Sequence, residues 1–232
     1  MKKKKYESIF FDLDGTLWDF RKNSAEALKQ LFLEYHLDQT GISLQQFLDF
    51  YHKNNDVLWK AYREGSVTKN ILRWKRFDLT LKQMGMNQPE LAYILDQAYL
   101  DTSKMKTNLI RGTFEILTYL SEKYSLFLVT NGFNEVQFTK IKNSGLADYF
   151  REVITSEMAG CLKPDPGFFS YALQRCKAIS QKSILIGDDD DADITGAQKS
   201  GIDQIYFSSD GNPSGHHPTY TIRKLSEIRN IL

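Results

Sequence analysis

Five short apolar runs constrain the fold of this chain more than any other feature of its sequence. They cover residues 8–11, 125–129, 152–154, 183–187 and 203–207, and each ends at Asp, Thr, Gly or Ser. Continuous apolar runs of this length are typical of strands that are buried on both faces of a parallel sheet. Helical patterns lie between the runs, so strand and helix alternate along the chain. The alternation predicts an α/β fold, a doubly wound, Rossmann-like parallel sheet with helices on both faces.

The segment between the first two runs has a different pattern and is helical throughout. Helix starts are indicated by two capping-box pairs and a proline: Asn23 with Glu26, Ser43 with Gln46, and Pro89. About four helices are therefore inserted after the first strand, and their apolar stripes predict a small bundle with its own core. We predict a core domain of residues 1–19 and 106–232 and an all-helical cap domain of residues 20–105. A last short strand near Tyr220 and a C-terminal helix complete the core domain.

The composition excludes several classes of protein. The 232 residues carry 30 Lys plus Arg against 29 Asp plus Glu, a formal net charge of +1. This balance excludes a strongly basic or acidic binding protein. The 41% of hydrophobic and 25% of charged residues exclude a disordered or collagen-like chain. Two cysteines, Cys161 and Cys176, cannot build a disulfide framework, and their scarcity fits a reducing compartment.

The N-terminus carries four lysines before an apolar patch, an order that superficially resembles a signal peptide. Asp12 breaks the patch after Ile9, Phe10 and Phe11, whereas a signal peptide needs about 7–15 apolar residues. The lysine run is therefore predicted to be a solvated tail. No stretch approaches the roughly 20 apolar residues of a membrane-spanning helix. We expect a cytoplasmic protein.

Polar residues gather where the predicted strands end. The first strand runs into Asp12-Leu13-Asp14-Gly15-Thr16, the second into Thr130-Asn131-Gly132, and the fourth into GDDDDAD at residues 187–193. Lys163 follows the third strand, just before a predicted helix start. The carboxyl ends of parallel strands meet at one edge of a sheet, where ligands bind. Each motif alone is also an ordinary turn or helix cap, and it is their shared location that indicates a site.

The gathered carboxylates indicate a bound cation. Carboxylates gathered at one edge would repel one another unless a cation were present. Oxygen ligands favour a hard cation, and we predict Mg²⁺. With Lys163 and the pair Thr130–Asn131, the cluster suits phosphoryl transfer, because cations and fixed donors stabilise charge on the phosphoryl oxygens. One carboxylate is a candidate nucleophile that would form an aspartyl-phosphate.

The motifs FDLDGT, VTNG, LKPDP and GDxxxxD, in this order, resemble the four motifs of the haloacid dehalogenase superfamily of phosphohydrolases. The resemblance covers the whole chain, because the helical insert after the first motif is similar to the superfamily's small helical cap of the first type. It implies a hydrolase with Mg²⁺ as its cofactor. We expect a small-molecule phosphate monoester as substrate, with neither a nucleic-acid polymer nor a membrane as partner. The oligomeric state, monomer or dimer, stays open.

The resemblance implies a role for each acidic motif residue. Asp12 is implied to be the nucleophile and a metal ligand. Asp14 is implied to be the general acid and base, and to bind the metal through its main-chain carbonyl. Asp188 would complete the Mg²⁺ shell, and Asp193 would support that shell from behind. Asp189 to Asp191 have two interpretations, a helix N-terminal cap or a second shell around the cation.

The other motif residues are implied to hold the phosphoryl group. Thr130 would hydrogen-bond it with support from the Asn131 amide. Gly15 and Gly132 are implied to lie among the substrate-binding residues. Lys163 would offset the negative charge of the nucleophile and the phosphate.

The second aspartate of the first motif, Asp14, distinguishes between the reactions of the superfamily. Its dehalogenases lack this residue, because they need no proton donor to a phosphate ester, so Asp14 favours phosphate chemistry. LWDF after the first motif and a WKAYREGSVT-like turn in the cap resemble the pyrimidine 5′-nucleotidase branch. We therefore predict dephosphorylation of pyrimidine-type nucleoside 5′-monophosphates. The alternatives are a phosphatase of sugar phosphates or phosphoglycolate-like metabolites, a phosphomutase, and a catalytically silent binding protein, which the intact motifs disfavour.

Substrate choice is expected to come from the cap. Trp18, just after the first motif, either stacks on a base or packs within the protein, and packing is favoured. Gly65, in the turn of residues 63–66, would let that turn approach the mouth of the site closely. Structural rather than ligand roles are favoured for the following: Arg73 and Arg76 as surface salt bridges, Cys161 as a small buried residue, and His216 with His217 as a solvated turn.

Overall fold

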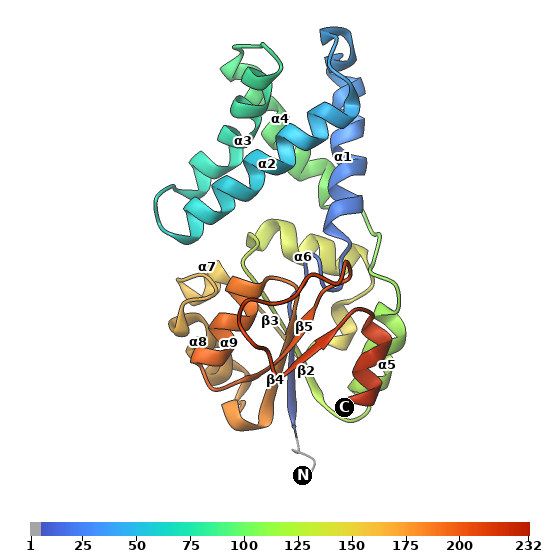
Figure 1. The fold of residues 1–232 in the computed structure, drawn as a ribbon, viewed down its shortest axis with the longest axis vertical. Helices are drawn as coiled ribbons and strands as arrows, with labels where there is room; N and C mark the ends of the chain where they lie inside the picture. Colours follow the sequence, from blue (N-terminus) through green and yellow to red (C-terminus); the bar gives the residue numbers. More distant parts are fainter. Residues whose placement is uncertain (1–5) are drawn as a thin grey trace. The chain divides into compact units, whose positions relative to one another are not determined.

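A parallel sheet of six strands, in the order β3-β2-β1-β4-β5-β6, forms the core unit of the computed structural model, which describes residues 6–232 (Figure 1). The strands are β1 (Ser8–Phe11), β2 (Ser125–Thr130), β3 (Glu152–Thr155), β4 (Ser183–Gly187), β5 (Asp203–Phe207) and β6 (Tyr220–Ile222). Every neighbouring pair is parallel. The four lysines predicted to form a solvated tail lie outside the described residues.

The register of the sheet brings the polar strand ends together. β1 lies between β2 and β4, and Phe11 pairs with Leu128 and Ile186. The residue that follows, Asp12, is therefore level with the ends of both neighbouring strands. All four residues of β1 are buried, and Phe10 and Phe11 pack in different apolar clusters. Successive side chains of a strand point to opposite faces, so β1 is covered on both sides.

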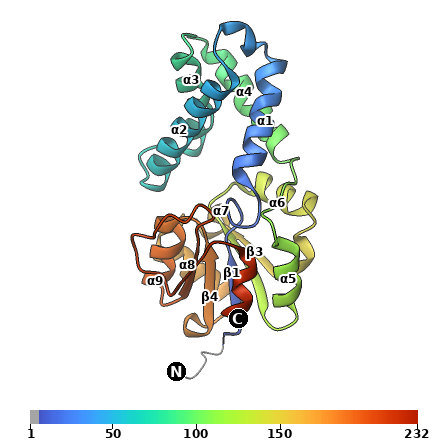
Figure 2. The same ribbon diagram turned by 45° about the vertical axis from the view of Figure 1, so that its right-hand side comes forward.

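Helices cover both faces of the sheet (Figures 1 and 2). One apolar cluster includes residues of α5 (Thr113–Ser121), α6 (Asn134–Asn143) and η5 (Leu225–Asn230), and the other includes residues of α8 (Pro166–Cys176) and α9 (Gly196–Lys199). Three short turns of helix join the strands: η2 (Ala147–Tyr149), α7 (Ser156–Ala159) and η3 (Ser180–Lys182). The predicted doubly wound α/β fold is confirmed. The predicted C-terminal helix is present as the 3₁₀ helix η5.

A second compact unit, Arg21–Lys106, is helical, and the core unit comprises Met1–Phe20 and Thr107–Leu232. The domain boundaries predicted from the sequence each lie one residue earlier than these. The helices of this part are α1 (Phe20–Glu34), η1 (Leu37–Thr40), α2 (Leu44–Arg63), α3 (Lys69–Gln83) and α4 (Pro89–Ser103). Within residues 6–232, no helix has the length and apolar character that crossing a membrane requires.

The helix starts in this unit follow the sequence signals with one exception. Ser43 and Gln46 form the predicted capping box of α2, and Pro89 opens α4. Asn23 was expected to cap α1, but that helix begins earlier, at Phe20, and the Asn23 side chain is buried within its first turns. The Asn23–Glu26 capping box is therefore a wrong prediction.

A buried cation lies inside the helical unit. Arg76 is 4% exposed, and its guanidinium lies 4.9 Å from the ring centroid of Tyr99. It pairs with Asp96 at 3.4 Å, and Arg73 pairs with the same carboxylate at 3.0 Å. The predicted surface salt bridge is thus wrong for Arg76, whose charge is compensated within the core between α3 and α4.

Candidate active site

The end of β1 places Asp12 against a buried ammonium group. Lys163 Nζ lies 2.7 Å from Asp12 Oδ1 and 2.6 Å from Asp193 Oδ1. It also donates to the main-chain oxygen of Val129 at 3.1 Å, so all three N–H bonds of the ammonium are used. Lys163 is 2% exposed. The strand end and the loop before α8 are therefore joined by charge-assisted hydrogen bonds that water does not reach.

Asn131 holds the backbone of this lysine. Its Oδ1 accepts from the main-chain N–H of Lys163 at 2.8 Å, and its Nδ2 donates to the main-chain oxygen of Lys163 at 2.9 Å. Both polar atoms of the amide are occupied in this way. The Asn131 side chain thus positions the backbone of Lys163, and the support of the phosphoryl group by the Asn131 amide stays a prediction.

Asp188, just after β4, lies beside Asp12. One carboxylate oxygen from each of Asp12, Asp188 and Asp193 lies within 4.8 Å of the others. Thr16 Oγ1 donates to Asp188 Oδ1 at 2.9 Å. Gly15 has a φ of +94°, and a β-carbon there would collide with the Asp188 carboxylate, so only glycine fits. Gly15 thus lets its loop pack closely on Asp188, and its contact with a substrate stays a prediction.

Asp193 supports the site from behind. Its Oδ1 binds Lys163, and its Oδ2 accepts from the main-chain N–H of Asp189 at 3.2 Å. Asp189 in turn caps the π-helical turn η4 (Asp190–Thr195), because its Oδ1 accepts from the main-chain N–H groups of Asp191 and Ala192 at 3.1 and 2.8 Å. The capping interpretation thus describes the Asp189 side chain.

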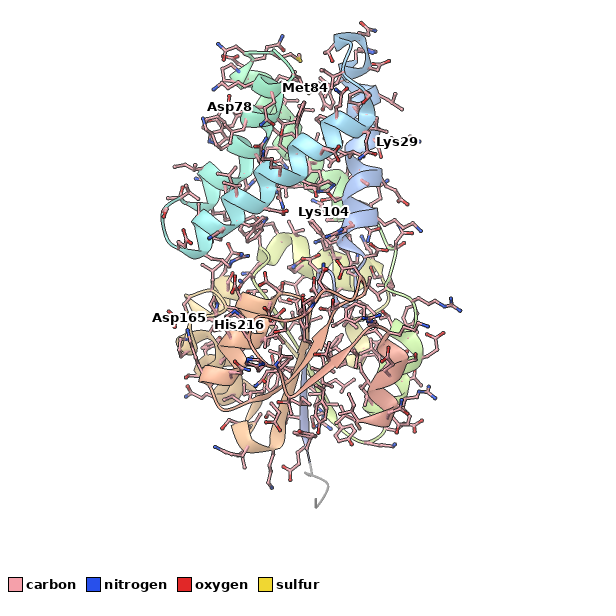
Figure 3. The ribbon with its side chains drawn as sticks, in the orientation of Figure 1. Lys29, Asp78, Met84, Lys104, Asp165 and His216 are labelled. Atoms are coloured by element: carbon pink, nitrogen blue, oxygen red, sulfur yellow. The ribbon has the colours of Figure 1, made fainter. Side chains whose placement is uncertain are left out.

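The other two aspartates of the run, Asp190 and Asp191, contact the loop of residues 208–219 between β5 and β6. Asp190 accepts from the Ser214 hydroxyl and from the main-chain N–H of Gly215, the latter at 2.8 Å. Asp191 Oδ1 lies 3.1 Å from Nε2 of His216, which is labelled in Figure 3. These contacts tie the loop to η4. His216 thus contacts Asp191 while its side chain stays 39% exposed, as the predicted solvated turn requires.

Burial dominates the electrostatics of the three-aspartate cluster. It raises the pKa of Asp12 well above the usual range, against the opposing effect of the Lys163 charge. Burial also raises the pKa of Asp188 to about 7, and the charge of Asp193 adds to this effect. For Lys163, burial alone would lower the pKa, but Asp12 and Asp193 outweigh it and raise the pKa. Two buried carboxylates, Asp12 and Asp193, thus contact one ammonium group, and the half-buried Asp188 lies beside them.

Asp14 lies in a different environment. Lys140 Nζ donates to Asp14 Oδ1 at 2.6 Å, and Gln137 Nε2 donates to Asp14 Oδ2 at 2.6 Å. Both donors project from α6. Neither residue was identified from the sequence. Their separation of three residues puts them on one face of a helix, directly after the TNG motif, and this is the signal that could have found them.

Thr130 is positioned by the same helix. Its Oγ1 accepts from Gln137 Nε2 at 2.7 Å and from the main-chain N–H of Gly132 at 3.1 Å. With both acceptor positions filled, the hydroxyl hydrogen is left to donate. A β-carbon at Gly132 would collide with the Gln137 side chain, so this glycine makes room for Gln137. The geometry suits Thr130 as a hydrogen-bond donor to a phosphoryl oxygen.

Trp18 and Gly65 were the two remaining residues predicted to contact the substrate. Trp18 is 1% exposed, and Lys140 Nζ lies 3.9 Å from its ring centroid, so stacking on a base is wrong and packing is what the structure shows. Gly65, in the turn between α2 and α3, has a φ of +72° and open space around it. Its approach to a substrate stays a prediction. Cys161 is partly exposed rather than buried.

The arrangement of these residues can be compared with known proteins. A family model described as haloacid dehalogenase-like hydrolase matches residues 9–207. The chain belongs to this family. YfnB of Bacillus subtilis (strain 168), named a HAD-hydrolase, is 33% identical over 99% of this chain and 96% of its own length. A crystal structure of YfnB bound to magnesium has a TM-score of 0.90 and covers 99% of both chains.

Two further relatives in the haloacid dehalogenase-like family are named pyrimidine 5′-nucleotidases. PynA of Streptococcus pneumoniae (strain ATCC BAA-255 / R6) is 31% identical over 98% of this chain and 95% of its own length. YjjG of Escherichia coli (strain K12) is 28% identical over 98% of both chains. The similarity therefore extends over both units of the hydrolase.

The site of this hydrolase fits the Mg²⁺ that its family implies. The carboxylates of Asp12, Asp188 and Asp193 offer only oxygen atoms, the ligands that hard cations prefer. When all three are ionised, their charge exceeds that of Lys163 by two, which is the charge of a divalent cation. Both oxygens of Asp193 are already engaged. Asp12 and Asp188 would therefore hold the ion, together with the Asp14 carbonyl that the family resemblance implies.

Adding Mg²⁺ is expected to raise the melting temperature, and more so at higher pH. The pKa of Asp188, about 7, lies above its ordinary value of 3.8. Between these values the folded protein binds more protons than the unfolded chain, so without metal the free energy of unfolding falls as pH rises from about 4 to about 7. Mg²⁺ would offset this loss. At 100 times its Kd it would contribute about 2.7 kcal/mol, or roughly 5–10 °C for a chain of this size.

Scanning fluorimetry at pH 5 and pH 8, with and without Mg²⁺, measures this effect. Sodium chloride at matched ionic strength is the control, because it screens charges without binding the carboxylates as a divalent ion does. An equal rise with sodium chloride, or a larger Mg²⁺ effect at pH 5 than at pH 8, would contradict the metal assignment.

Proposed function

We propose that this protein is a Mg²⁺-dependent phosphomonoesterase that dephosphorylates pyrimidine nucleoside 5′-monophosphates through an aspartyl-phosphate. The observation that carries the proposal is the contrast between the two aspartates after β1. Asp12 is buried against Lys163, whereas the Asp14 side chain is 27% exposed and bound by donors from α6. Two carboxylates in such different environments suit two roles, a nucleophile and a proton carrier.

In the first step, a carboxylate oxygen of Asp12 attacks phosphorus, and the bond between phosphorus and the 5′ oxygen breaks. Lys163 favours the ionised, nucleophilic form of Asp12 from 2.7 Å. Asp14 donates its proton to the departing oxygen, which leaves as the nucleoside hydroxyl. Mg²⁺, when bound, would offset the charge of the phosphoryl oxygens. Thr130 donates its remaining hydroxyl hydrogen to one of these oxygens.

In the second step, water attacks the phosphorus of the aspartyl-phosphate. Asp14, now ionised, takes a proton from that water, and the bond between phosphorus and the Asp12 oxygen breaks. Inorganic phosphate forms, Asp12 is again a carboxylate, and Asp14 is again protonated. One residue thus serves as acid and then as base, which divides a slow hydrolysis into two faster steps.

The nucleotide class of the substrate is supported by the two relatives named as pyrimidine 5′-nucleotidases. Their similarity extends through the helical unit as well as the core, and the phosphate-handling residues lie in the core. Since the core site handles only the phosphate, the choice of the esterified group is expected to depend on the helical unit. Gly65 and its turn remain our proposed contact there.

A phosphate-release panel with Mg²⁺ is expected to favour UMP and TMP. We expect their kcat/KM to exceed that of AMP, ribose 5-phosphate and phosphoglycolate at least ~10-fold, a difference of about 1.4 kcal/mol in transition-state binding. EDTA is expected to abolish release from every substrate. A preference for sugar phosphates would reject the assignment as a nucleotidase but would leave the assignment as a phosphatase in place. Activation by a sugar bisphosphate with transfer between positions would indicate a mutase, and no release from any ester would reject catalysis.

A further inference from the structure

One turn of α6 supplies the donors that bind both carboxylate oxygens of Asp14. Lys140 takes Oδ1 and Gln137 takes Oδ2, each at 2.6 Å. The Lys140 side chain is 6% exposed, and Gln137 is fully buried. A carboxylate held at both oxygens cannot rotate without losing a hydrogen bond. The orientation of Asp14 is thus determined by α6 rather than by its own loop.

Gln137 donates a hydrogen bond to Asp14, but its own side-chain carbonyl oxygen is left without a partner. Its Nε2 donates to Asp14 and to Thr130, while its buried Oε1 has no hydrogen-bond partner within residues 6–232. Turning the amide over would remove the donor that Asp14 Oδ2 and Thr130 Oγ1 share. A buried polar atom without a partner costs about 1–3 kcal/mol. Such a cost is expected where a group is retained for its function rather than for stability.

Lys140 is itself held in place. Its ammonium lies 3.9 Å from the ring centroid of Trp18 and 6.0 Å from that of Phe20. A cation over an aromatic face is attracted by about 0.5–2 kcal/mol, depending on desolvation. Trp18 follows Asp14 by four residues, so the loop that carries the aspartate also carries the platform for its partner. The ammonium therefore has two fixed neighbours, a carboxylate and an indole ring.

We propose that Gln137 and Lys140 are positioning residues that hold the Asp14 carboxylate and the Thr130 hydroxyl in their reacting orientations. This inference rests on the proposed function, in which Asp14 carries the proton and Thr130 binds the phosphoryl group. The single Nε2 of Gln137 connects the two, because it donates to both within 2.7 Å. α6 thereby fixes the position of the Asp14 carboxyl relative to the Thr130 hydroxyl that binds the phosphoryl group.

The test compares Lys140→Met and Gln137→Leu with the control Lys142→Met, an exposed lysine on the same helix. For UMP, we expect kcat to fall ~10–100-fold in the first two variants with KM changed less than ~3-fold, because a misplaced proton carrier slows chemistry rather than binding. Lys140→Arg, which retains the cation, is expected to recover most of the lost rate. The kcat of the control Lys142→Met is expected to stay within ~2-fold of the wild-type value.

A second readout separates positioning from a general structural defect. p-Nitrophenolate leaves without needing a proton. In Lys140→Met, which retains the contact between Gln137 and Thr130, the pre-steady-state burst of its release from p-nitrophenyl phosphate should therefore keep its amplitude and lose less than ~3-fold in rate. Later turnover should slow, because water attack still needs Asp14 as base. A reduced burst amplitude would overturn the inference. So would a burst rate for p-nitrophenyl phosphate that falls as much as kcat for UMP, or a kcat for UMP that does not change.

Three further outcomes bear on this inference. If Lys140→Met does not fold, Gln137→Leu carries the same expectation on its own. If wild type releases no phosphate from any ester, the proposed function fails and the inference fails with it. If wild type prefers another alkyl phosphate, only the substrate assignment fails, and the same comparison is made with that ester.

Discussion

Asp12→Asn is expected to lower the turnover number at least ~10⁴-fold while leaving the fold intact. The amide has nearly the shape of the carboxylate but cannot attack phosphorus as an anion, so the aspartyl-phosphate does not form. The substitution also removes one of the three clustered carboxylates, that of Asp12, whose pKa is raised by burial. The melting temperature of the metal-free protein is therefore expected to stay the same or rise. Phosphate release and thermal unfolding measure the two effects.

Asp148→Asn is the matched control, because it makes the same chemical change at an exposed position in η2. Its turnover number is expected to stay within ~2-fold of wild type. The nucleophile assignment is wrong if folded Asp12→Asn retains more than about a hundredth of the wild-type rate on p-nitrophenyl phosphate, whose leaving group makes few demands on the enzyme.

Lys163→Met is expected to damage both activity and stability. The substitution leaves Asp12 and Asp193 buried without their ammonium partner, which costs about 3–5 kcal/mol for a pair of this kind. For a chain of this size the melting temperature would fall by roughly 10 °C. Turnover is expected to fall at least ~10³-fold, because the charge next to the nucleophile is no longer offset.

The stability loss in Lys163→Met is expected to depend on pH. Burial raises the pKa of both Asp12 and Asp193, so protonation removes their unpaired charge as the pH falls. The difference in melting temperature from wild type is therefore expected to be smaller at pH 5 than at pH 8. Lys142→Met serves as the control for loss of one lysine. A loss that is equal at both pH values would show that packing, and not charge, accounts for the role of Lys163.

The sheet and the acidic cluster follow from local sequence signals. A buried strand must end where its apolar run ends, and parallel pairing then brings Asp12, Asp188 and the end of β2 to one level. Lys163 lies at the same edge for a similar reason, since its loop connects α7, which directly follows β3, to α8. Register and connectivity leave these residues few other positions.

The contacts of individual side chains could not be derived in this way. Asn131 has an amide that fits a phosphoryl oxygen or a backbone equally well, and the turn geometry directs it to Lys163. Gln137 and Lys140 reach Asp14 only because of how α6 is rotated on the sheet, which depends on the packing of the whole core. The burial of Trp18 depends on the same packing. Long-range packing, rather than local pattern, decides these contacts.

The most direct test of this account is to identify the residue that carries the phosphoryl group. Wild-type protein is mixed with UMP and Mg²⁺, quenched within milliseconds, reduced with borohydride, which converts an aspartyl-phosphate to homoserine, and analysed by peptide mass spectrometry. We expect homoserine in place of Asp12 and unmodified aspartate at Asp14, Asp188 and Asp193. Conversion at a different aspartate, or phosphate release with Asp12 unmodified at every quench time, would contradict the account.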